Sequence, residues 1–390
     1  MSSGPKVSVI INNFNYARFL TDAIDSVLAQ TYSNLEVIVV DDGSTDSSID
    51  VMAGYGDKII PVLKENGGQG SAYNAGYAKS SGDLVCFLDA DDTLLEDAIA
   101  ATLEMYDPSD VVKIQWPMFV TDAAGTRDGR VTAVEPPPRG QLIERVVEEG
   151  PLYDFNYHTN CVYSRAFLDH VMPVPEPPYR NGADVYLTTL APIYGVLETL
   201  SRPFGTYRLH GANNYADRPL DDERLRDYIR RFDLNAEHLA EHLRRAGRDD
   251  VDPDHWRATA FNYLWPTRLL AVRQHVERLV PRGGEFILID GGEWGGSQPI
   301  AERRAVRVVE RDGLYWGPPA SDSEAIDEVE RLFTRGAELL VLWWTCYWWE
   351  DAYPLLLDHL DTHAHRLVDT DAAVIFCRRP GRLGGADDVQ

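Results

Sequence analysis

Three carboxylates follow one short apolar run. Leu84 to Leu88 is unbroken in its apolar character, and Asp89, Asp91 and Asp92 come directly after it. Such a run is typical of a strand buried on both faces, and its carboxyl end lies where open α/β sheets bind ligands. Like charges this close repel one another unless a cation neutralises them, and Mg²⁺ and Mn²⁺ prefer oxygen ligands. On this spacing alone, a divalent-metal site and a solvated acidic turn are equally compatible with the sequence.

A second predicted strand also ends in carboxylates. Leu35 to Val40 precedes Asp41 and Asp42, and an earlier strand, Val7 to Ile11, ends at Asn12. Segments of helical spacing separate the strands, so the alternation predicts an α/β fold with a mostly parallel, doubly wound sheet. Because the strand ends share one edge of that sheet, a ligand cleft is favoured over a chance acidic turn. The helices are expected at Phe19 to Gln30, Ser47 to Ala53 and Ser71 to Ser80.

A glycine-rich loop, Asn66 to Gly70, opens the helix that begins at Ser71. Its glycines lack the GxGxxG spacing of dinucleotide-binding loops, and the chain has no GxxxxGK[ST] motif. The sequence therefore disfavours a dinucleotide-binding or P-loop protein.

A later acidic residue opens an apolar helix. Asp184 precedes Val185 to Tyr194 and stands where an N-cap is expected. Capping would not exclude a catalytic role for this carboxylate. The segment before it, Pro173 to Pro178, is predicted to be a surface loop, and the further strands of this region are expected at Val111 to Trp116, Met118 to Thr121 and Tyr157 to Ser164.

The second half of the chain changes in character. Asp221 to Val280 is predicted to form two long amphipathic helices, broken at Ala246-Gly247 and again near Pro266. A second, small α/β unit of alternating strands and helices follows, and in it the aromatic cluster from Trp343 to Trp349 is read as core or an oligomer contact. We expect four segments: a first α/β domain over 1–215, a helical linker segment over 216–282, a small α/β domain over 283–380 and a polar tail over 381–390.

Composition limits the classes of protein and partner. The 390 residues are 44% hydrophobic, which suits a globular protein, and the formal net charge of −25 argues against nucleic acid as a partner. The four cysteines form no CxxC pair and are expected to be reduced core residues. The chain begins almost directly with a strand and has no apolar run near 20 residues, so we expect neither a signal peptide nor a transmembrane segment. The expected location is the cytoplasm, with peripheral attachment to the inner face of the membrane left open.

Five short segments, taken in order, resemble the family 2 glycosyltransferases, which have the GT-A fold. The similarity covers roughly residues 5–215. It implies a metal-dependent enzyme that transfers a sugar from a nucleotide diphosphate sugar, UDP-sugar being the expected donor, with inversion at the anomeric carbon. The matching segments are Val7 to Asn15, Gln30-Thr31-Tyr32, Val39 to Asp46, Asn74-Ala75-Gly76 and Phe87 to Asp92.

The resemblance implies roles for individual residues. Asp89 and Asp91 match the DxD motif that binds ribose and the metal–diphosphate, with Mn²⁺ or Mg²⁺ as the ion. Asp184 matches the catalytic base, and His210 resembles a residue that closes on the metal or diphosphate. The residues implied to contact the donor nucleotide are Asn12, Phe14, Asp42, Gln69, Asn74, Asp89, Ala90 and Asp91.

Three positions depart from the family pattern. Asn12-Asn13-Phe14-Asn15 stands where Pro-Thr-Tyr-Asn is usual, Tyr73 where many members have Arg, and Ala183 where the base is often preceded by Glu. The resemblance says little about residues 283–380, which look like a module appended in some bacterial glycosyltransferases and through which a homo-oligomer could form.

Two other functions stay open at this point. A sugar nucleotidyltransferase also binds nucleotide and metal on an α/β sheet, but Asn12 to Arg18 lacks the glycine- and lysine-rich loop it would need. A catalytically silent nucleotide-sugar-binding assembly protein is the other alternative, and Tyr73 and Ala183 keep it open. The acceptor is not predicted; cell-surface glycan assembly and glycosylation of a natural product or a protein are both compatible with the sequence.

Overall fold

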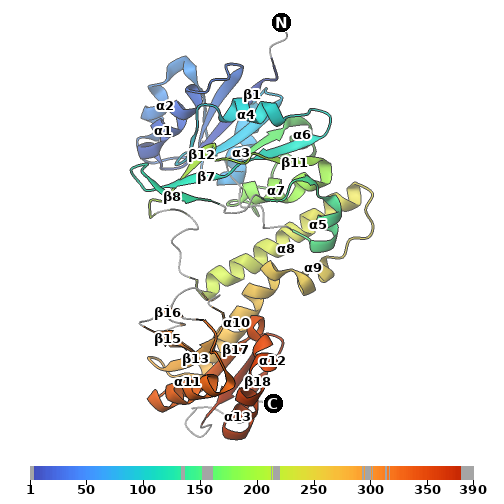
Figure 1. The fold of residues 1–390 in the computed structure, drawn as a ribbon. Coiled ribbons are helices and arrows are strands. Elements are labelled where there is room, and N and C mark those ends of the chain that lie inside the picture. Colours follow the sequence, from blue (N-terminus) through green and yellow to red (C-terminus); the bar gives the residue numbers. More distant parts are fainter. Residues whose placement is uncertain are drawn as a thin grey trace. The chain divides into compact units, whose positions relative to one another are not determined.

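The computed structural model describes residues 4–132, 137–151, 161–211, 213, 220–291, 294, 300, 302–311, 314–315 and 317–378. The chain divides into two compact units, one made of Met1–Arg218 and Arg230–Ala260, the other of Pro219–Ile229 and Phe261–Gln390 (Figure 1). The domain boundaries expected from the sequence stay predictions, and the predicted polar tail lies outside the described residues. None of the described helices is long and apolar enough to cross a membrane.

An eight-stranded mixed sheet forms the centre of the first unit, in the order β3-β2-β1-β4-β10-β6-β11-β9. The first four strands in this order are parallel to one another, and β10 pairs antiparallel with both β4 and β6. This arrangement confirms the mixed, doubly wound α/β class. The strands are β1 (Val7–Asn13), β2 (Leu35–Asp41), β3 (Ile60–Leu63), β4 (Leu84–Asp89), β6 (Val111–Gln115), β9 (Gly140–Gln141), β10 (Cys161–Ser164) and β11 (Val196–Thr199).

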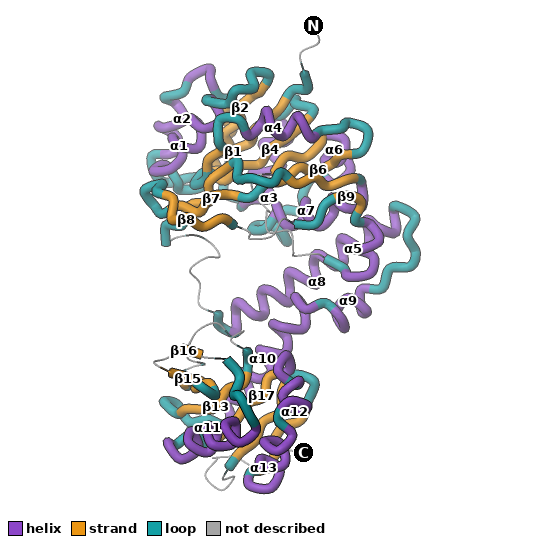
Figure 2. Tube along the Cα trace, viewed as in Figure 1, coloured by secondary structure: helices purple, strands orange, loops and turns teal. Residues whose placement is uncertain are grey.

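Helices cover both faces of the large sheet (Figure 2). Alternate side chains of β1 pack against the two layers of helices. Val9 and Ile11 join the apolar core that contains residues of α1 (Ala17–Leu28) and α4 (Ala98–Met105). Ile10 faces α3 (Gln69–Lys79), where a Cβ on Gly76 would lie 2.4 Å from its Cγ2 atom. The remaining short helices of this part are α2 (Ser48–Ala53), η1 (Gly56–Lys58), α5 (Ile143–Glu149), α6 (Arg165–Val171) and α7 (Ala183–Tyr194).

A smaller sheet, in the order β5-β12-β7-β8, stands beside the large one. Its strands are β5 (Thr93–Leu94), β12 (Gly205–Arg208), β7 (Met118–Thr121) and β8 (Arg127–Val131). Strands β6 and β7, both expected from the sequence, lie in different sheets. The chain turns at buried Trp116, and β7 then pairs in parallel with β12 from much later in the sequence.

Helix boundaries correct two predictions. Helix α7 begins at Ala183, with Gly182 in a left-handed conformation (φ 93°) as its N-cap, so Asp184 lies in the first turn and is not the cap. The segment before it, Pro173–Pro178, is the expected surface loop, with Val174 buried in it. Pro266 does not break a helix: it is the sixth residue of α10, which continues past it without the one hydrogen bond that a proline nitrogen cannot donate. The helices of this region are α8 (Asp222–Arg245), α9 (Pro253–Thr259) and α10 (Phe261–Leu279).

The second unit contains a five-stranded sheet in the order β14-β13-β17-β19-β18. In its aromatic cluster, Trp343 and Trp349 are buried, as the core interpretation predicts, whereas Trp348 is 48% exposed. All four cysteines of the chain are buried, and none of them forms a disulfide. The elements of this unit are β13 (Glu285–Ile289), β14 (Arg304–Arg307), β15 (Glu310–Arg311), β16 (Leu314–Tyr315), α11 (Asp322–Arg335), β17 (Leu339–Trp343), η2 (Trp344–Cys346), α12 (Trp348–Ala352), α13 (Pro354–His363), β18 (His365–Asp369) and β19 (Ala373–Cys377).

Candidate active site

A pocket of about 850 Å³ opens at the carboxyl ends of the parallel strands. Register explains the gathering of polar side chains there: Asn12 of β1 pairs with Asp89 of β4, and Asn13 pairs with Asp41 of β2. The pocket is also walled by the hairpin of β7 and β8 and by the start of α7. Its charged lining residues in the described chain are Asp42, Asp89, Asp91, Arg130, Arg180 and Asp184.

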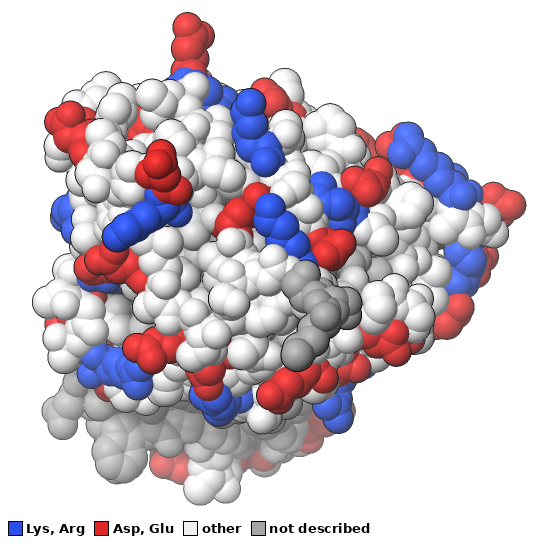
Figure 3. All heavy atoms as spheres, turned by 90° about the horizontal axis from the view of Figure 1, so that it is seen from above, with Lys and Arg blue, Asp and Glu red and all other residues white. Residues whose placement is uncertain are grey.

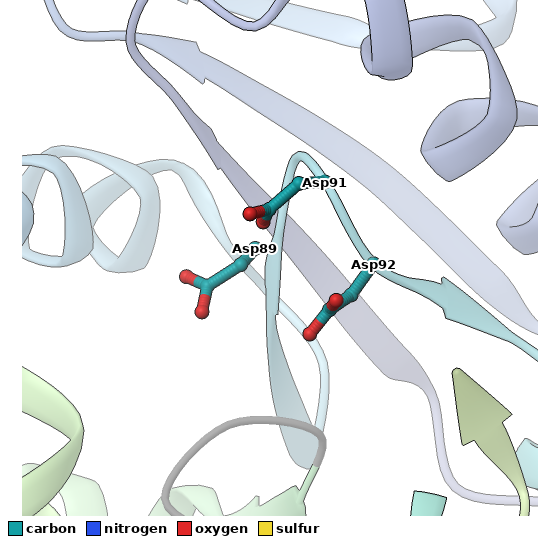
Figure 4. A group of neighbouring side chains, drawn as sticks. All are labelled: Asp89, Asp91 and Asp92. Atoms are coloured by element: carbon teal, nitrogen blue, oxygen red, sulfur yellow. The ribbon is translucent and has the colours of Figure 1, made fainter. Parts of the chain in front are cut away.

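The three carboxylates after β4 can bring oxygen atoms within 4.8 Å of one another. Figure 4 shows the carboxyl groups of Asp89 and Asp91 on one side of the turn and that of Asp92 on the other. Asp92 is buried and accepts a hydrogen bond of 3.0 Å from the backbone N–H of Arg208, so it anchors β12 to the turn. The Arg208 guanidinium also donates to the Asp91 carbonyl, at 3.0 Å. Asp89 and Asp91 are therefore the two carboxylates that face the pocket.

The surroundings of Asp89 change the pKa of its carboxyl group. Burial, reinforced by the charges of Asp91 and Asp184, raises the pKa of Asp89 to about 7. Hydrogen bonds from Asn12 and Gln69 act in the opposite direction, and the Asn12 Nδ2 atom lies 2.8 Å from Asp89 Oδ1. A carboxyl group in this state is stabilised as an anion by a bound cation. The oxygen donors and their mutual repulsion thus fit a hard divalent ion.

His210 lies beside Asp91, with its side chain fully buried. Its Nε2 atom is 3.0 Å from Asp91 Oδ2, and its Nδ1 atom is 3.2 Å from the Arg18 guanidinium. Because an arginine can only donate, Nδ1 is assigned as the acceptor and Nε2 as the protonated nitrogen that donates to Asp91. In this arrangement His210 orients Asp91, and its role as a metal ligand stays a prediction.

Asp42 organises the glycine-rich loop. Its buried carboxylate accepts hydrogen bonds from the backbone N–H groups of Gly67 (2.9 Å) and Gly68 (2.7 Å), and it pairs with Lys64 at 2.5 Å. Asn66 also donates to it, at 3.1 Å. Asp42 lines the pocket, but these partners occupy both of its oxygen atoms. Its expected contact with the nucleoside base stays a prediction.

Gln69 connects the loop with α7. Its Oε1 atom accepts hydrogen bonds from the backbone N–H groups of Gly182 (2.8 Å) and Ala183 (3.0 Å), which supplies the cap that Asp184 was expected to provide. The Asp184 carboxylate, which lines the pocket, accepts no hydrogen bond from any residue in the described ranges. The first turn of α7 therefore presents to the pocket a carboxylate that can accept a proton.

Most of the predicted site residues come together. Phe14 is 45% exposed at the pocket, and Ala90 lines it between the two carboxylates. Asn74 does not line the pocket: its Nδ2 atom donates to the Val174 carbonyl at 2.9 Å, and its Oδ1 atom accepts from the Val174 N–H at 2.8 Å. The residues of the predicted set that line the pocket are Asn12, Phe14, Asp42, Gln69, Asp89, Ala90, Asp91 and Asp184.

Sequence reasoning missed two pocket residues of note. Arg180 is an exposed side chain whose guanidinium donates to Asn66, and its carbonyl accepts from the Gln69 N–H at 2.7 Å. Tyr16 lies close enough to the carboxylates that burial and the charges of Asp91 and Asp89 raise its pKa. Only the position of Arg180 just before Asn181-Gly182, next to the start of α7, could have indicated its role.

Comparison with known families matches residues 8–172 to the model of glycosyl transferase family 2. An uncharacterised glycosyltransferase of Nostoc sp. is 37% identical over 214 residues, which cover 54% of this chain and 66% of the relative. One of Rickettsia prowazekii is 43% identical over 106 residues, covering 27% of this chain and 33% of the relative. The chain thus covers less than two thirds of the length of these curated relatives.

Solved structures show a looser likeness. TarS of S. aureus, residues 1–349 in complex with UDP, has a TM-score of 0.46 and 19% identity, covering 70% of this chain and 72% of that chain. The mannosyltransferase PcManGT of Pyrobaculum calidifontis, in complex with GDP-Man and Mn²⁺, has a TM-score of 0.42 and 19% identity over 70% of this chain and 75% of that chain.

Proposed function

We propose, from the match of residues 8–172 to the model of glycosyl transferase family 2, that the protein transfers a sugar from a nucleotide diphosphate sugar to a hydroxyl group, with inversion. A UDP-sugar is the expected donor. The observation that carries the proposal is that one pocket joins two metal-type carboxylates, Asp89 and Asp91, with the unengaged carboxylate of Asp184. The domain organisation, with this site in 1–215 and a module over 283–380 outside the chemistry, is part of the proposal.

Asp89 and Asp91 would hold Mn²⁺ or Mg²⁺, and His210 would fix the orientation of Asp91. A divalent ion in this position supplies positive charge for the diphosphate that leaves. Asn12 holds Asp89 in place by its amide N–H, while its own buried Oδ1 atom has no partner among the described residues. That oxygen is an acceptor that a donor N–H or hydroxyl group could satisfy.

Asp184 would act as general base. The acceptor hydroxyl loses its proton as it bonds to the anomeric carbon, and a carboxylate within hydrogen-bond reach can take that proton. The carboxylate of Asp184, in the first turn of α7, also interacts favourably with the helix dipole. The bond from the sugar to the diphosphate breaks as the new bond forms on the opposite side, which gives inversion.

Arg180 would contact the donor phosphates. Tyr73 stands where many relatives have an arginine, and it is buried and stacked on Phe87 with ring centroids 4.0 Å apart. It therefore packs against the sheet and offers no cation to the pocket. Arg180 lies at the pocket beside Asn66, and an arginine suits two phosphate oxygens because its donors form a planar fork.

The proposal is tested with purified protein, a panel of nucleotide sugars and Mn²⁺, with release of the nucleoside diphosphate as the readout. We expect one donor to be hydrolysed or transferred in a metal-dependent manner, releasing UDP or another diphosphate. Release of inorganic pyrophosphate from a nucleoside triphosphate and a sugar phosphate would instead identify a nucleotidyltransferase. Binding of nucleotide with metal, shown by a raised melting temperature, but no turnover with any donor would favour an assembly protein.

A further inference from the structure

A lysine is buried in the central sheet directly behind the site. Lys113 of β6 is fully buried, between β10 and β11 in the sheet order. Its Nζ atom donates to Thr188 Oγ1 at 3.0 Å, and Thr188 Oγ1 is also 3.1 Å from the hydroxyl of Tyr163. Burying an ammonium group is costly, so a fold that needed only packing here would be served equally well by an apolar side chain.

The bond to Thr188 ties this lysine to the helix that carries Asp184. Thr188 follows Asp184 by four residues in α7, so the two side chains lie on the same face of the helix, one turn apart. Asp184 is at the pocket end of that turn, and Thr188, which is buried, is at the interior end. Lys113 therefore bonds to the turn that presents the carboxylate.

We propose that Lys113 is a positioning residue for the transfer reaction: its hydrogen bond to Thr188 fixes the first turns of α7 and thereby the place of Asp184. The inference rests on the proposed role of Asp184 as base. It adds a residue that touches neither donor nor acceptor.

The polar group around Lys113 agrees with this role. Burial is the larger influence on Lys113 and lowers its pKa, while the charges of Cys161 and Asp184 act in the opposite direction. Burial also raises the pKa of Tyr163, so this neighbour of Thr188 stays a neutral hydroxyl at neutral pH. Lys113, Thr188 and Tyr163 thus form one buried polar group that joins β6 and β10 to α7.

Lys113→Met separates this role from a structural one, because methionine fills a similar volume without charge. A buried charge replaced by an apolar side chain is often neutral or stabilising, so the variant should fold and melt no lower than the parent. We expect its affinity for UDP with Mn²⁺ to stay within a few-fold of the parent. Its kcat for transfer should fall about 10-fold or more, because the start of α7 loses the bond that holds Asp184 in place. Lys79→Met, at an exposed position on α3, is the matched control and should leave kcat unchanged.

A double-mutant cycle tests the bond through which Lys113 acts. Lys113→Met, Thr188→Val and the double variant should show non-additive losses of kcat, because each single change breaks the same hydrogen bond. If Lys113→Met does not fold, Thr188→Val, which removes the bond at nearly constant volume, replaces it in the comparison with the parent. An unchanged kcat in the variant that folds would overturn the inference about Lys113. Retained transfer by Asp184→Asn would instead overturn the proposed base, whatever Lys113 does.

Discussion

The side-chain oxygen of Gln69 lies 2.8 Å from the backbone nitrogen of Gly182 and caps the helix on which Asp184 stands. The Gln69 amide also lowers the pKa of the Asp89 carboxyl group. One side chain thus links the carboxylate expected to hold the metal with the helix that presents the expected base. The relative placement of the two reacting partners depends on this link, because positioning is a large part of the rate of a two-substrate reaction.

Gln69→Ala should therefore lower transfer more than nucleotide binding. Loss of the cap is expected to destabilise the protein by about 1 kcal/mol, the usual cost of removing a cap acceptor. We expect kcat to fall roughly 10- to 100-fold as Asp184 loses its position. Gln69→Glu is the matched control, because its carboxylate can accept both N–H groups but cannot donate to Asp89. Equal kcat for Gln69→Ala and the parent would contradict the link.

The pKa of Asp89 predicts a pH-dependent stability of the metal-free protein. Its folded value, about 7, is above the 3.8 of an ordinary aspartate, so the folded state favours the protonated form. The stabilisation from this group is complete below pH 3.8 and is lost as the pH rises through 7. Asp89→Asn removes the charge, so its melting temperature should exceed that of the parent more at pH 8 than at pH 5.5. An equal difference in melting temperature at both pH values would show that the pKa of Asp89 is not raised.

Arg180→Ala should weaken donor binding through the phosphates. A hydrogen bond to a charged group is worth roughly 1.5–3 kcal/mol, so the dissociation constant for UDP with Mn²⁺ should rise about 10-fold or more. Arg180→Lys keeps the charge but loses the planar pair of donors, so its dissociation constant should lie between those of the parent and of Arg180→Ala. Arg202→Ala, at a 57% exposed side chain that pairs with Asp97 outside the pocket lining, is the control. If Arg180→Ala binds UDP as tightly as the parent does, groups other than Arg180 contact the phosphates.

The surface charge gives no competing functional site on the face seen in Figure 3. There, Lys and Arg side chains of the described residues are scattered among Asp and Glu side chains instead of gathering into a basic patch. Such a face lacks the concentrated positive charge that a phosphate backbone needs. Among the described residues, the group of side chains that could hold a metal ion is Asp89, Asp91 and Asp92, in the turn after β4.

The sequence predicts those parts of the fold that depend on local pattern. Apolar runs give β1, β2 and β4, and the carboxylates at their ends meet because parallel strands share an edge. Contacts between distant segments were not predictable. The cap of α7 comes from Gln69, over a hundred residues earlier, so Asp184 looked like the cap when read locally. Asn74 points to the Val174 segment and not to the pocket, a direction that its motif does not encode.

Pairings between distant strands are not predictable for the same reason. Strands β6 and β7 are separated by two residues, yet they belong to different sheets. The pairing of β7 with β12 joins residues about ninety positions apart, and no local signal announces it. Pro266 suggested a break, but α10 continues past it and lacks only the hydrogen bond that the proline nitrogen cannot donate.

The most direct test of the account is transfer by Asp184→Asn, measured with the donor identified by the nucleotide-sugar screen. Asparagine has nearly the size of aspartate, and Gln69 caps the helix in either case, so the variant should fold normally. We expect its affinity for UDP with Mn²⁺ to match that of the parent, because Asp89 and Asp91 are unchanged. Its rate of transfer should fall by about 10²- to 10⁴-fold, the usual contribution of a positioned base. Transfer within a few-fold of the parent, at equal nucleotide affinity, would contradict the account and place the base elsewhere.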